Sequence, residues 1–189
     1  MSKRIIVGVT GASGAIYAHT LIKTLVALQA EVQLIFTQAG SQVYAYETAC
    51  QPEDWSDGVR LWDNEDLFSP LASGSYPFDA LVVIPCSMNT LGSLASGTGD
   101  RLLTRVAQVA LKEHRQLIVV PREMPFNVIH LENMLRLARA GAVMMAAAPG
   151  FYHLPQGLDD LVGHVVGKVL DQLNIEHQMY KRWEGRRSS

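Results

Sequence analysis

The chain contains few cysteines, has little net charge and lacks long apolar runs. Only two of its 189 residues are cysteines, Cys50 and Cys86, and their spacing matches no metal-binding motif. The formal net charge of −2 indicates no general attraction to nucleic acid or to anionic membranes. No apolar run reaches transmembrane length, and the N-terminus does not resemble a signal peptide. We therefore expect a cytoplasmic protein without nucleic-acid or membrane partners.

Apolar residues, in contrast, are plentiful enough for one well-buried core. They make up 48% of the chain, and no Pro-rich or Ser-rich linker divides it. This composition predicts a single domain over residues 1–189, with 174–189 as a C-terminal tail.

Short apolar runs alternate with helical patterns along the chain. The β-type runs are "RIIVGV", "EVQLIFT", "ALVVIP", "QLIVVP" and "GAVMMA", and the helical patterns include 14–28, 100–113, 127–140 and 158–173. Strands that are apolar throughout are covered on both faces. The pattern predicts a doubly wound α/β fold, with a mostly parallel sheet and helices on both faces. Residues 51–79 show no clear periodicity.

In such folds ligands bind beyond the carboxyl ends of the strands, so the first strand end is informative. The turn "TGASG" at 10–14 completes a G-x-x-G-x-x-G spacing that differs from the dinucleotide fingerprint, and no Gly-Lys-Ser/Thr follows it. The second strand ends in Thr37-Gln38 and not in the acidic residue typical of NAD sites. Two readings remain: the turn amides and the Ser13 hydroxyl bind an anion at a helix N-terminus, or Ser13 only caps the helix.

The third apolar run ends in "PCSMNT", which places polar side chains before a helical stretch. Ser87, Asn89 and Thr90 can cap that helix, bind part of a ligand, or do both. We interpret Cys86 as a small buried residue and not as a nucleophile, because no histidine lies near it in the sequence.

Charged residues form two further groups. Arg101, Arg105 and Lys112 share one helix face, which is either solvated or lies against a cleft. Arg122 and Glu123 directly follow the fourth apolar run. There they can bind a phosphate and serve as acid or base, or form an ion pair with each other.

Taken together, these motifs resemble the flavin prenyltransferases of the UbiX family over nearly the whole chain. The motifs are "GVTGASGAIYA", "YETA", "LASGS", "PCSMNTL", "LLTRVAQVALKE", "VPREMPFNVIHLENM", "AAPGFYH" and "RW". The resemblance implies a flavodoxin-like (Rossmann-like) subunit that binds FMN. It also implies transfer of a dimethylallyl group from dimethylallyl monophosphate to N5 and C6 of reduced FMN. The product, prenylated FMN, is the cofactor of UbiD-type decarboxylases.

The resemblance also implies roles for individual residues. The positions that match FMN contacts are Gly11, Ala12, Ser13, Thr37, Ser87, Met88, Asn89, Thr90 and Arg122. The positions that match the surroundings of the prenyl phosphate are Arg105, Lys112, Glu123, Tyr152 and Lys168. Ser13 and Glu47 resemble the pair that hydrogen-bonds near N5, and Tyr152 and Trp183 are candidates to shelter the allylic cation.

This chemistry requires stabilisation of the departing phosphate. Asp63 and Asp66 are spaced like half of a magnesium-diphosphate motif, but no second acidic cluster accompanies them, so we expect no metal site. Arg105, Lys112 and Lys168 are expected to offset the phosphate charge instead.

Ring closure at C6 releases a proton, for which Glu47, Glu123 and the released phosphate are the candidate acceptors. The chain departs from some family members at Leu67-Phe68, where they carry a tryptophan. Phe68 and Trp62 are the candidate substitutes.

Two alternative functions remain open at this point. A flavin-dependent cysteine decarboxylase of the related fold also uses a "P-x-x-N-T" strand end, although its Pro-x-Met-Asn-x-x-Met clamp is replaced here by "PREMPFNVIHLENM". A non-catalytic flavin-binding partner of a decarboxylase is the second alternative.

The segments 100–113 and 127–140 carry more apolar surface than one small sheet needs, which favours self-association. The family resemblance implies a homo-oligomer, typically a dodecamer. We expect Tyr152, Lys168 and Trp183 to complete a pocket whose FMN is held mainly by a neighbouring chain.

Overall fold

A computed structural model describes residues 2–55 and 58–185. The chain divides into two compact units, residues 1–146 and 147–189, which we describe separately. The single domain with a tail from residue 174 stays a prediction.

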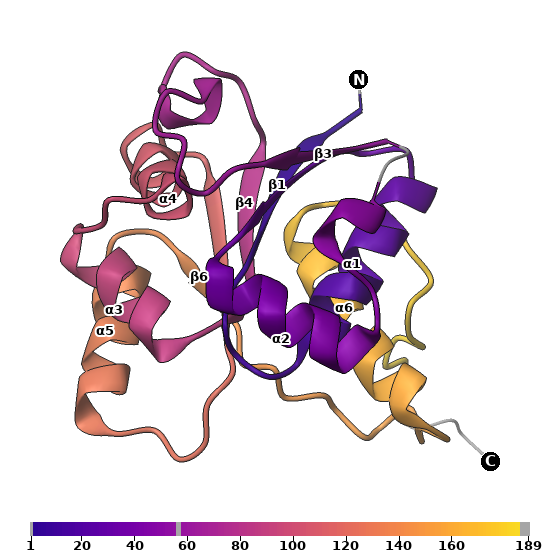
Figure 1. The fold of residues 1–189 in the computed structure, drawn as a ribbon. Helices are drawn as coiled ribbons and strands as arrows, with labels where there is room; N and C mark the ends of the chain where they lie inside the picture. Colours follow the sequence, from indigo (N-terminus) through magenta and orange to yellow (C-terminus); the bar gives the residue numbers. More distant parts are fainter. Residues whose placement is uncertain (1, 56–57, 186–189) are drawn as a thin grey trace. The chain divides into compact units, whose positions relative to one another are not determined.

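The first unit is built on a six-stranded parallel sheet with the order β3-β2-β1-β4-β5-β6 (Figure 1). The strands are β1 (Arg4–Val9), β2 (Glu31–Phe36), β3 (Val59–Trp62), β4 (Ala80–Cys86), β5 (Gln116–Pro121) and β6 (Val143–Met144). All five apolar runs contain a strand, so these predictions are confirmed. The edge strand β3 was missed because it has only four residues, two of them exposed, and therefore carries no continuous apolar run.

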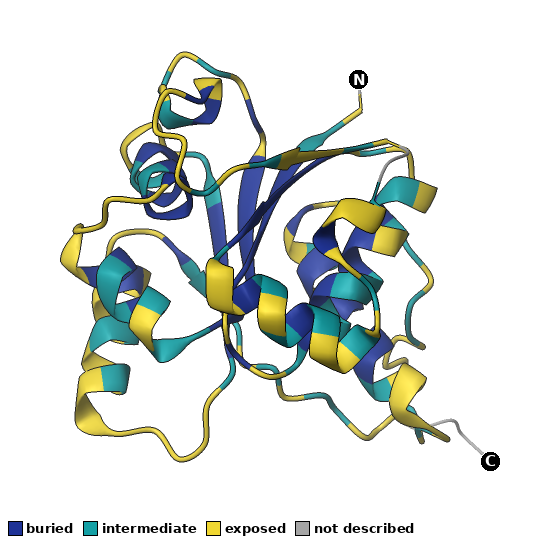
Figure 2. Ribbon diagram, in the orientation of Figure 1, coloured by how far each residue is buried: buried dark blue, intermediate teal, exposed yellow. Residues whose placement is uncertain are grey.

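Helices cover both faces of this sheet. They are α1 (Ala15–Ala27), α2 (Gln38–Thr48), α3 (Met88–Ser96), α4 (Leu102–Lys112) and α5 (Val128–Arg139), with short 3-10 turns at Pro52–Asp54 and Pro70–Ala72. Ile6, Leu81 and Leu117 adjoin one another in the strand register and share a buried cluster with residues of α3 and α4. The next residues, Val7 and Val82, point to the opposite face of the sheet and are also fully buried. Helix α1 contacts β1, β2 and β4, and Figure 2 shows the central strands as buried. Burial on both faces explains the unbroken apolar runs and confirms the predicted doubly wound α/β fold.

The second unit consists of α6 (Leu158–Gln172) and the irregular segments on either side of it. Asp159 and Asp160 lie in the first turn of α6, where negative charge stabilises a helix. The C-terminal segment folds back on the helix, and the ring of Tyr180 packs directly on Gly167. The contact is so close that a Cβ at Gly167 would lie 2.5 Å from the ring. Within the described part of the chain, every helix is too short or too polar to cross a membrane.

Candidate flavin site

The sheet order reverses between β1 and β4, and a cavity of about 470 Å³ lies beyond the strand ends at this point. Ligands of open α/β sheets bind at such a reversal. Residues that follow three neighbouring strands line the cavity: Gly11 after β1, Thr37 after β2, and Ser87, Asn89 and Thr90 after β4. The structure therefore brings together most of the residues that the resemblance associated with FMN.

Two helix N-termini border this cavity. Thr37 is the N-cap of α2 and accepts a hydrogen bond from the amide of Gly40 (3.0 Å). Ser87 is the N-cap of α3 and accepts one from the amide of Thr90 (3.3 Å). Ser87 thus caps α3, with the amide of Thr90 as the donor, and both residues also line the cavity. The positive ends of the two helix dipoles make this region suitable for an anion such as a phosphate group.

Close approach of the glycine turn to α2 shapes one wall of the cavity. A Cβ at Gly11 would lie 2.6 Å from the Cβ of Ala39, so a larger residue at position 11 would collide with α2. Ala12 is buried. Met88, the first residue of α3, packs against the core.

Glu47 binds the N-terminus of α1. Its carboxylate accepts hydrogen bonds from the amides of Gly14 and Ala15, both at 2.8 Å. Burial raises the pKa of Glu47, but the hydrogen bonds from Ser13, Ala15 and Gly14, together with the charge of Arg122, lower it below its usual value. The carboxylate is therefore ionised at neutral pH.

This arrangement excludes a Ser13 cap on α1 and limits which amides of the turn could bind an anion. Ser13 does not cap α1, because the N-cap residue is Gly14, which has a φ of 105° and no side chain of its own to act as a cap. The amides of Gly14 and Ala15 bind Glu47 and so are not free for an added anion. Ser13 and Glu47 nevertheless lie together, as the resemblance implied.

Arg122 also reaches the turn, because its Nε donates a hydrogen bond to the carbonyl of Ser13 (2.9 Å). Glu123 is exposed, and its carboxylate accepts a hydrogen bond from the amide of Met124 (3.0 Å). The alternative of an ion pair between Arg122 and Glu123 is not what the structure shows for these described residues. Cys86 is fully buried, and burial raises the pKa of its thiol, so it is a poor nucleophile.

The cationic face of α4 lies against the segment 65–74. Arg101 forms an ion pair with Glu65 (2.7 Å), and Arg105 Nε donates to the carbonyl of Ala72 (3.0 Å). Lys112 pairs with Glu113, which follows it in the chain. The predicted stripe therefore faces a loop and is not merely solvated.

That loop contains the "LASGS" motif, and one more cationic side chain binds its backbone. Arg115 donates two hydrogen bonds of 2.6 Å, to the carbonyls of Gly74 and Tyr76. The hydroxyls of Ser73 and Ser75 are 2.8 Å apart at the tip of the loop. Arg105, Lys112 and Arg115 thus gather positive charge around a polar turn.

Two residues at the site were missed from the sequence. Thr10 is buried, and its Oγ1 donates to the carbonyl of Pro85 (2.8 Å) and accepts from the amide of Ser87 (2.7 Å). Asn64 binds the N-terminus of α4 through the amides of Leu102 (2.8 Å) and Leu103 (3.0 Å). Because these bonds join residues 38 or more positions apart, no local pattern indicates them.

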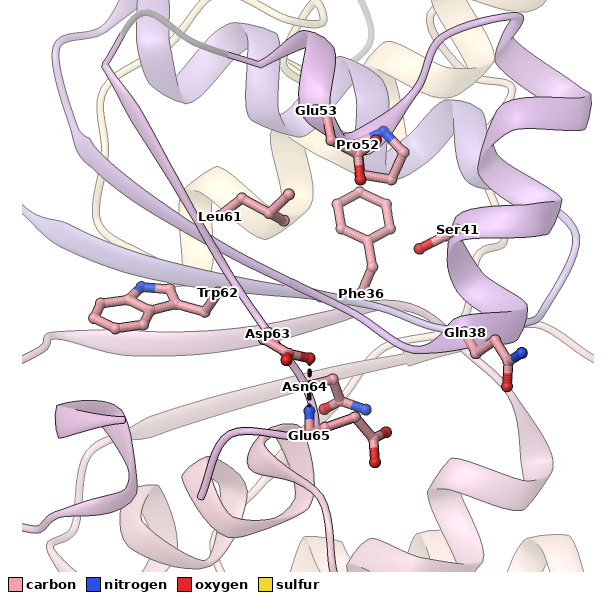
Figure 3. Close-up of a pocket in the computed structure, with 10 residues that line it drawn as sticks. All are labelled: Phe36, Gln38, Ser41, Pro52, Glu53, Leu61, Trp62, Asp63, Asn64 and Glu65. Atoms are coloured by element: carbon pink, nitrogen blue, oxygen red, sulfur yellow. Dashed lines mark hydrogen bonds between the residues drawn. The ribbon is translucent and has the colours of Figure 1, made fainter. Parts of the chain in front are cut away.

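A second cavity, of about 450 Å³, adjoins β3 (Figure 3). Its apolar residues are Phe36, Leu61 and Trp62, and it also contains the acidic residues Glu53, Asp63 and Glu65. Asp63 is a turn residue here, since its Oδ1 accepts from the amide of Glu65 (2.9 Å). These three carboxylates disfavour a phosphate. Glu65 and Asp100 also line the cavity at the β1/β4 reversal, but there Arg101 and the N-termini of α2 and α3 supply positive charge, so that cavity is the better flavin site.

The candidate substitutes for the family tryptophan have different environments. Trp62 is held in place, because its Nε1 donates to Gln33 (2.8 Å) and the guanidinium of Arg60 lies 3.7 Å from the ring centroid. Phe68 is completely exposed. Of the two, only Phe68 is free to move toward a ligand.

The second unit contains Tyr152, Lys168 and Trp183. The rings of Tyr152 and Trp183 meet edge to face, with 5.9 Å between their centroids. His164, which the sequence analysis missed, lies behind Tyr152. Its Nδ1 accepts from the amide of Gly150 (3.2 Å), so Nε2 carries the proton and donates to the Tyr152 hydroxyl (3.3 Å). Burial, followed by the neighbouring His153 and Lys168, lowers the pKa of His164.

Comparison with known proteins identifies the family to which the chain belongs. The Flavoprotein family profile matches residues 1–170. A flavin prenyltransferase UbiX of Methanocaldococcus jannaschii is 48% identical over 184 residues, covering 95% of this chain and 98% of that protein. A flavin prenyltransferase UbiX of Pseudomonas aeruginosa is 42% identical over 196 residues, covering 96% and 94%.

Solved structures similar to this chain indicate the same family. AnUbiX (PadA1) in complex with FMN and dimethylallyl pyrophosphate has a TM-score of 0.95 and 36% identity, covering 98% of this chain and all of that chain. A dodecameric FMN-dependent UbiX-like decarboxylase from Escherichia coli O157:H7 has a TM-score of 0.91 and 41% identity, covering 96% and 100%. A PPC decarboxylase mutant at 22% identity and a TM-score of 0.66, covering 92% and 99%, shares the fold alone. The chain therefore belongs to the flavoprotein family and, within it, to the flavin prenyltransferases of the UbiX family.

Proposed function

We propose that this protein transfers a dimethylallyl group from dimethylallyl monophosphate to N5 and C6 of reduced FMN, giving prenylated FMN. The carrying observation is the cavity at the β1/β4 reversal, which residues at the ends of three strands line and which the N-termini of α2 and α3 border. The 48% identity to a named flavin prenyltransferase supports the same reaction. The cysteine-decarboxylase alternative is not favoured, because the PPC decarboxylase resemblance extends to the fold alone.

The chain's own residues fit FMN. The N-termini of α2 and α3 suit its phosphate, and Gly11 leaves room beside α2. The residues proposed to hold it are Gly11, Ala12, Ser13, Thr37, Ser87, Met88, Asn89, Thr90 and Arg122. When bound and reduced, FMN supplies the nucleophilic N5 and C6 atoms.

Cationic side chains are proposed to stabilise the departing phosphate. Arg105 and Lys112 border the polar "LASGS" loop, and Lys168 belongs to the second unit. A phosphate monoester carries a charge of about −1.5 to −2 near neutrality, which two or three cations can offset without a metal. Tyr152 and Trp183 are proposed to shelter the positive charge that develops on the allyl group.

A carboxylate is proposed to accept the proton that C6 loses. Glu47 is ionised and hydrogen-bonded to Ser13, and Glu123 is exposed beside Arg122. The released phosphate is the third acceptor. Ser13 and Glu47 orient one edge of the site, because Arg122 and the α1 amides fix them from two sides.

The direct test is incubation of the purified protein with reduced FMN and dimethylallyl monophosphate under anaerobic conditions, followed by mass spectrometry of the flavin. We expect a flavin heavier by one C5 prenyl unit. A folded protein that binds FMN but forms no such product would disprove the proposal and favour a non-catalytic flavin-binding role.

We further propose a homo-oligomer, a dodecamer, in which neighbouring copies share active sites and pass prenylated FMN to a UbiD-type decarboxylase in the cytoplasm. Val128 and Ile129 at the start of α5 are 68% and 66% exposed, and Phe126 and Leu131 beside them are also exposed. Such a continuous apolar face is unusual on a monomer. Light scattering tests the mass, and mixed oligomers of Ser13→Ala and Lys168→Ala chains should regain part of the activity if sites are shared.

A further inference from the structure

Asp171, near the end of α6, gathers four side chains of the second unit around one carboxylate. Its Oδ1 accepts from Arg182 (2.6 Å) and from His177 Nε2 (3.1 Å). Its Oδ2 accepts from the Tyr180 hydroxyl (2.5 Å) and from Lys168 Nζ (3.3 Å). Three of these donors belong to the C-terminal segment and one to α6, so Asp171 joins the segment to the helix.

The carboxylate is well suited to this role. Only 18% of its side chain is exposed. Burial raises the pKa of Asp171, but the hydrogen bonds from Arg182, Tyr180, His177 and Lys168 outweigh burial and hold it well below its usual range. Hydrogen bonds to an ionised group are stronger than those between neutral groups, so the anchor persists at all physiological pH values.

The anchor determines where Trp183 lies. Arg182 precedes Trp183 directly and spans both carboxylate oxygens of Asp171, with its second amino group 3.4 Å from Oδ2. The ring of Tyr180 packs against Gly167, where a Cβ would lie 2.5 Å away. With residues 180 and 182 fixed, the indole of Trp183 is held in edge contact with Tyr152.

The same carboxylate orients Lys168. The Lys168 side chain is 46% exposed, and its bond to Asp171 reduces the number of positions that this long side chain adopts. Lys168 and Arg182 together carry two positive charges against the one negative charge of Asp171. The cluster therefore retains an excess of positive charge that can attract a phosphate.

We propose that Asp171 is a positioning residue for the prenyl phosphate substrate: it holds Lys168 by a direct bond and fixes Trp183 through the C-terminal segment, without touching the substrate itself. This inference rests on the proposed function, because that proposal places Trp183 and Lys168 at the substrate. It extends that proposal to a residue that neither the sequence motifs nor the resemblance singled out.

The test compares Asp171→Asn with Asp159→Asn, the same change on an exposed residue at the start of the same helix. The first readout is the rate of tryptic cleavage after Lys181 and Arg182, followed by mass spectrometry. The second is the KM for dimethylallyl monophosphate, with the Kd for FMN as the control. For Asp171→Asn we expect cleavage at least about fivefold faster and a KM about tenfold higher, with an unchanged Kd for FMN. Asp159→Asn should match the wild type in all three.

A wild-type cleavage rate in Asp171→Asn would overturn the proposal, as would faster cleavage with a KM within twofold of the wild type. If Asp171→Asn does not fold, Arg182→Gln replaces it, since the Arg182 side chain is 60% exposed and Lys181 remains as a cleavage site. Wild-type values for Arg182→Gln in both readouts would equally overturn it. A wild-type protein that neither binds nor converts dimethylallyl monophosphate would disprove the proposed function instead, and the cleavage rates would still decide whether Asp171 anchors the segment.

Discussion

The hydroxyl of Thr10 accepts a hydrogen bond from the amide of Ser87, 2.7 Å away and 77 positions later in the chain. The same hydroxyl donates to the carbonyl of Pro85, so one buried side chain joins the carboxyl ends of β1 and β4. This bond lies where the sheet order reverses and fixes Ser87, the N-cap residue of α3.

Thr10→Val keeps the shape of the side chain and removes the hydroxyl. It leaves the Ser87 amide without this partner, and we expect the free energy of unfolding to fall by about 1–3 kcal/mol. FMN binding should weaken as well, because Ser87 lines the cavity. Urea unfolding and flavin fluorescence titration measure the two effects, and Thr10→Ser, which keeps a hydroxyl, is the control. Equal stability of the Val and Ser variants would contradict this prediction.

Glu47 makes stability depend on pH in the acid range. Its pKa in the folded protein is lower than its ordinary value of 4.5, so its stabilising contribution is complete above that value and is lost as the pH falls through the folded pKa. Glu47→Gln should remove this contribution and flatten the pH dependence. Urea midpoints measured from pH 7 to pH 3 test this, and parallel curves for the variant and the wild type would refute it.

Tyr44 holds α2 against α1 through its hydroxyl, which lies 2.8 Å from His19 Nδ1 and accepts from Trp55 Nε1 (2.9 Å). Tyr44 is fully buried, so Tyr44→Phe leaves Trp55 Nε1 without this partner. We expect a loss of about 1–3 kcal/mol in thermal or urea unfolding. Tyr46→Phe on the same helix is the matched control, because Tyr46 is 92% exposed and should lose almost nothing.

Gly40 allows α2 to approach the end of β1. A Cβ at Gly40 would lie 2.3 Å from the carbonyl oxygen of Val9, and backbone atoms cannot move aside as a side chain can. Gly40→Ala should therefore destabilise the protein by about 1–3 kcal/mol. Gly92→Ala should instead stabilise it by about 0.5–1 kcal/mol, since the nearest atom to a Cβ in α3 is 3.6 Å away. Equal urea midpoints for the two variants would show that this packing argument is wrong.

Glu123→Gln tests the proposed acid or base beside Arg122. The residue is exposed and interacts with its own loop, so FMN binding should persist while turnover falls by about 10²–10⁴-fold. Formation of prenylated FMN by mass spectrometry measures turnover, and Glu132→Gln on exposed α5 is the control. Turnover within threefold of the wild type would exclude Glu123 from the chemistry.

The sequence by itself determined the sheet and its ligand edge. A strand buried on both faces must be apolar at every position, so the runs at 4–9, 80–85 and 116–121 are visible without any partner. The residues that follow such strands lie at the ligand edge, which is why Thr37 and Ser87 could be named as candidates. Motifs of this length also indicated the family.

Tertiary structure decided which groups bind the N-termini of α1 and α4 and where the C-terminal segment is fixed. A Ser13 cap on α1 was one of the two readings of the sequence, but the carboxylate of Glu47 binds the α1 amides from 32 and 33 positions away. Asn64 likewise serves α4, and Asp171 fixes Arg182 after the chain has turned back on α6. These contacts have no periodic signature, because a hydrogen bond between distant residues depends on where the packed elements bring them and not on their spacing along the chain.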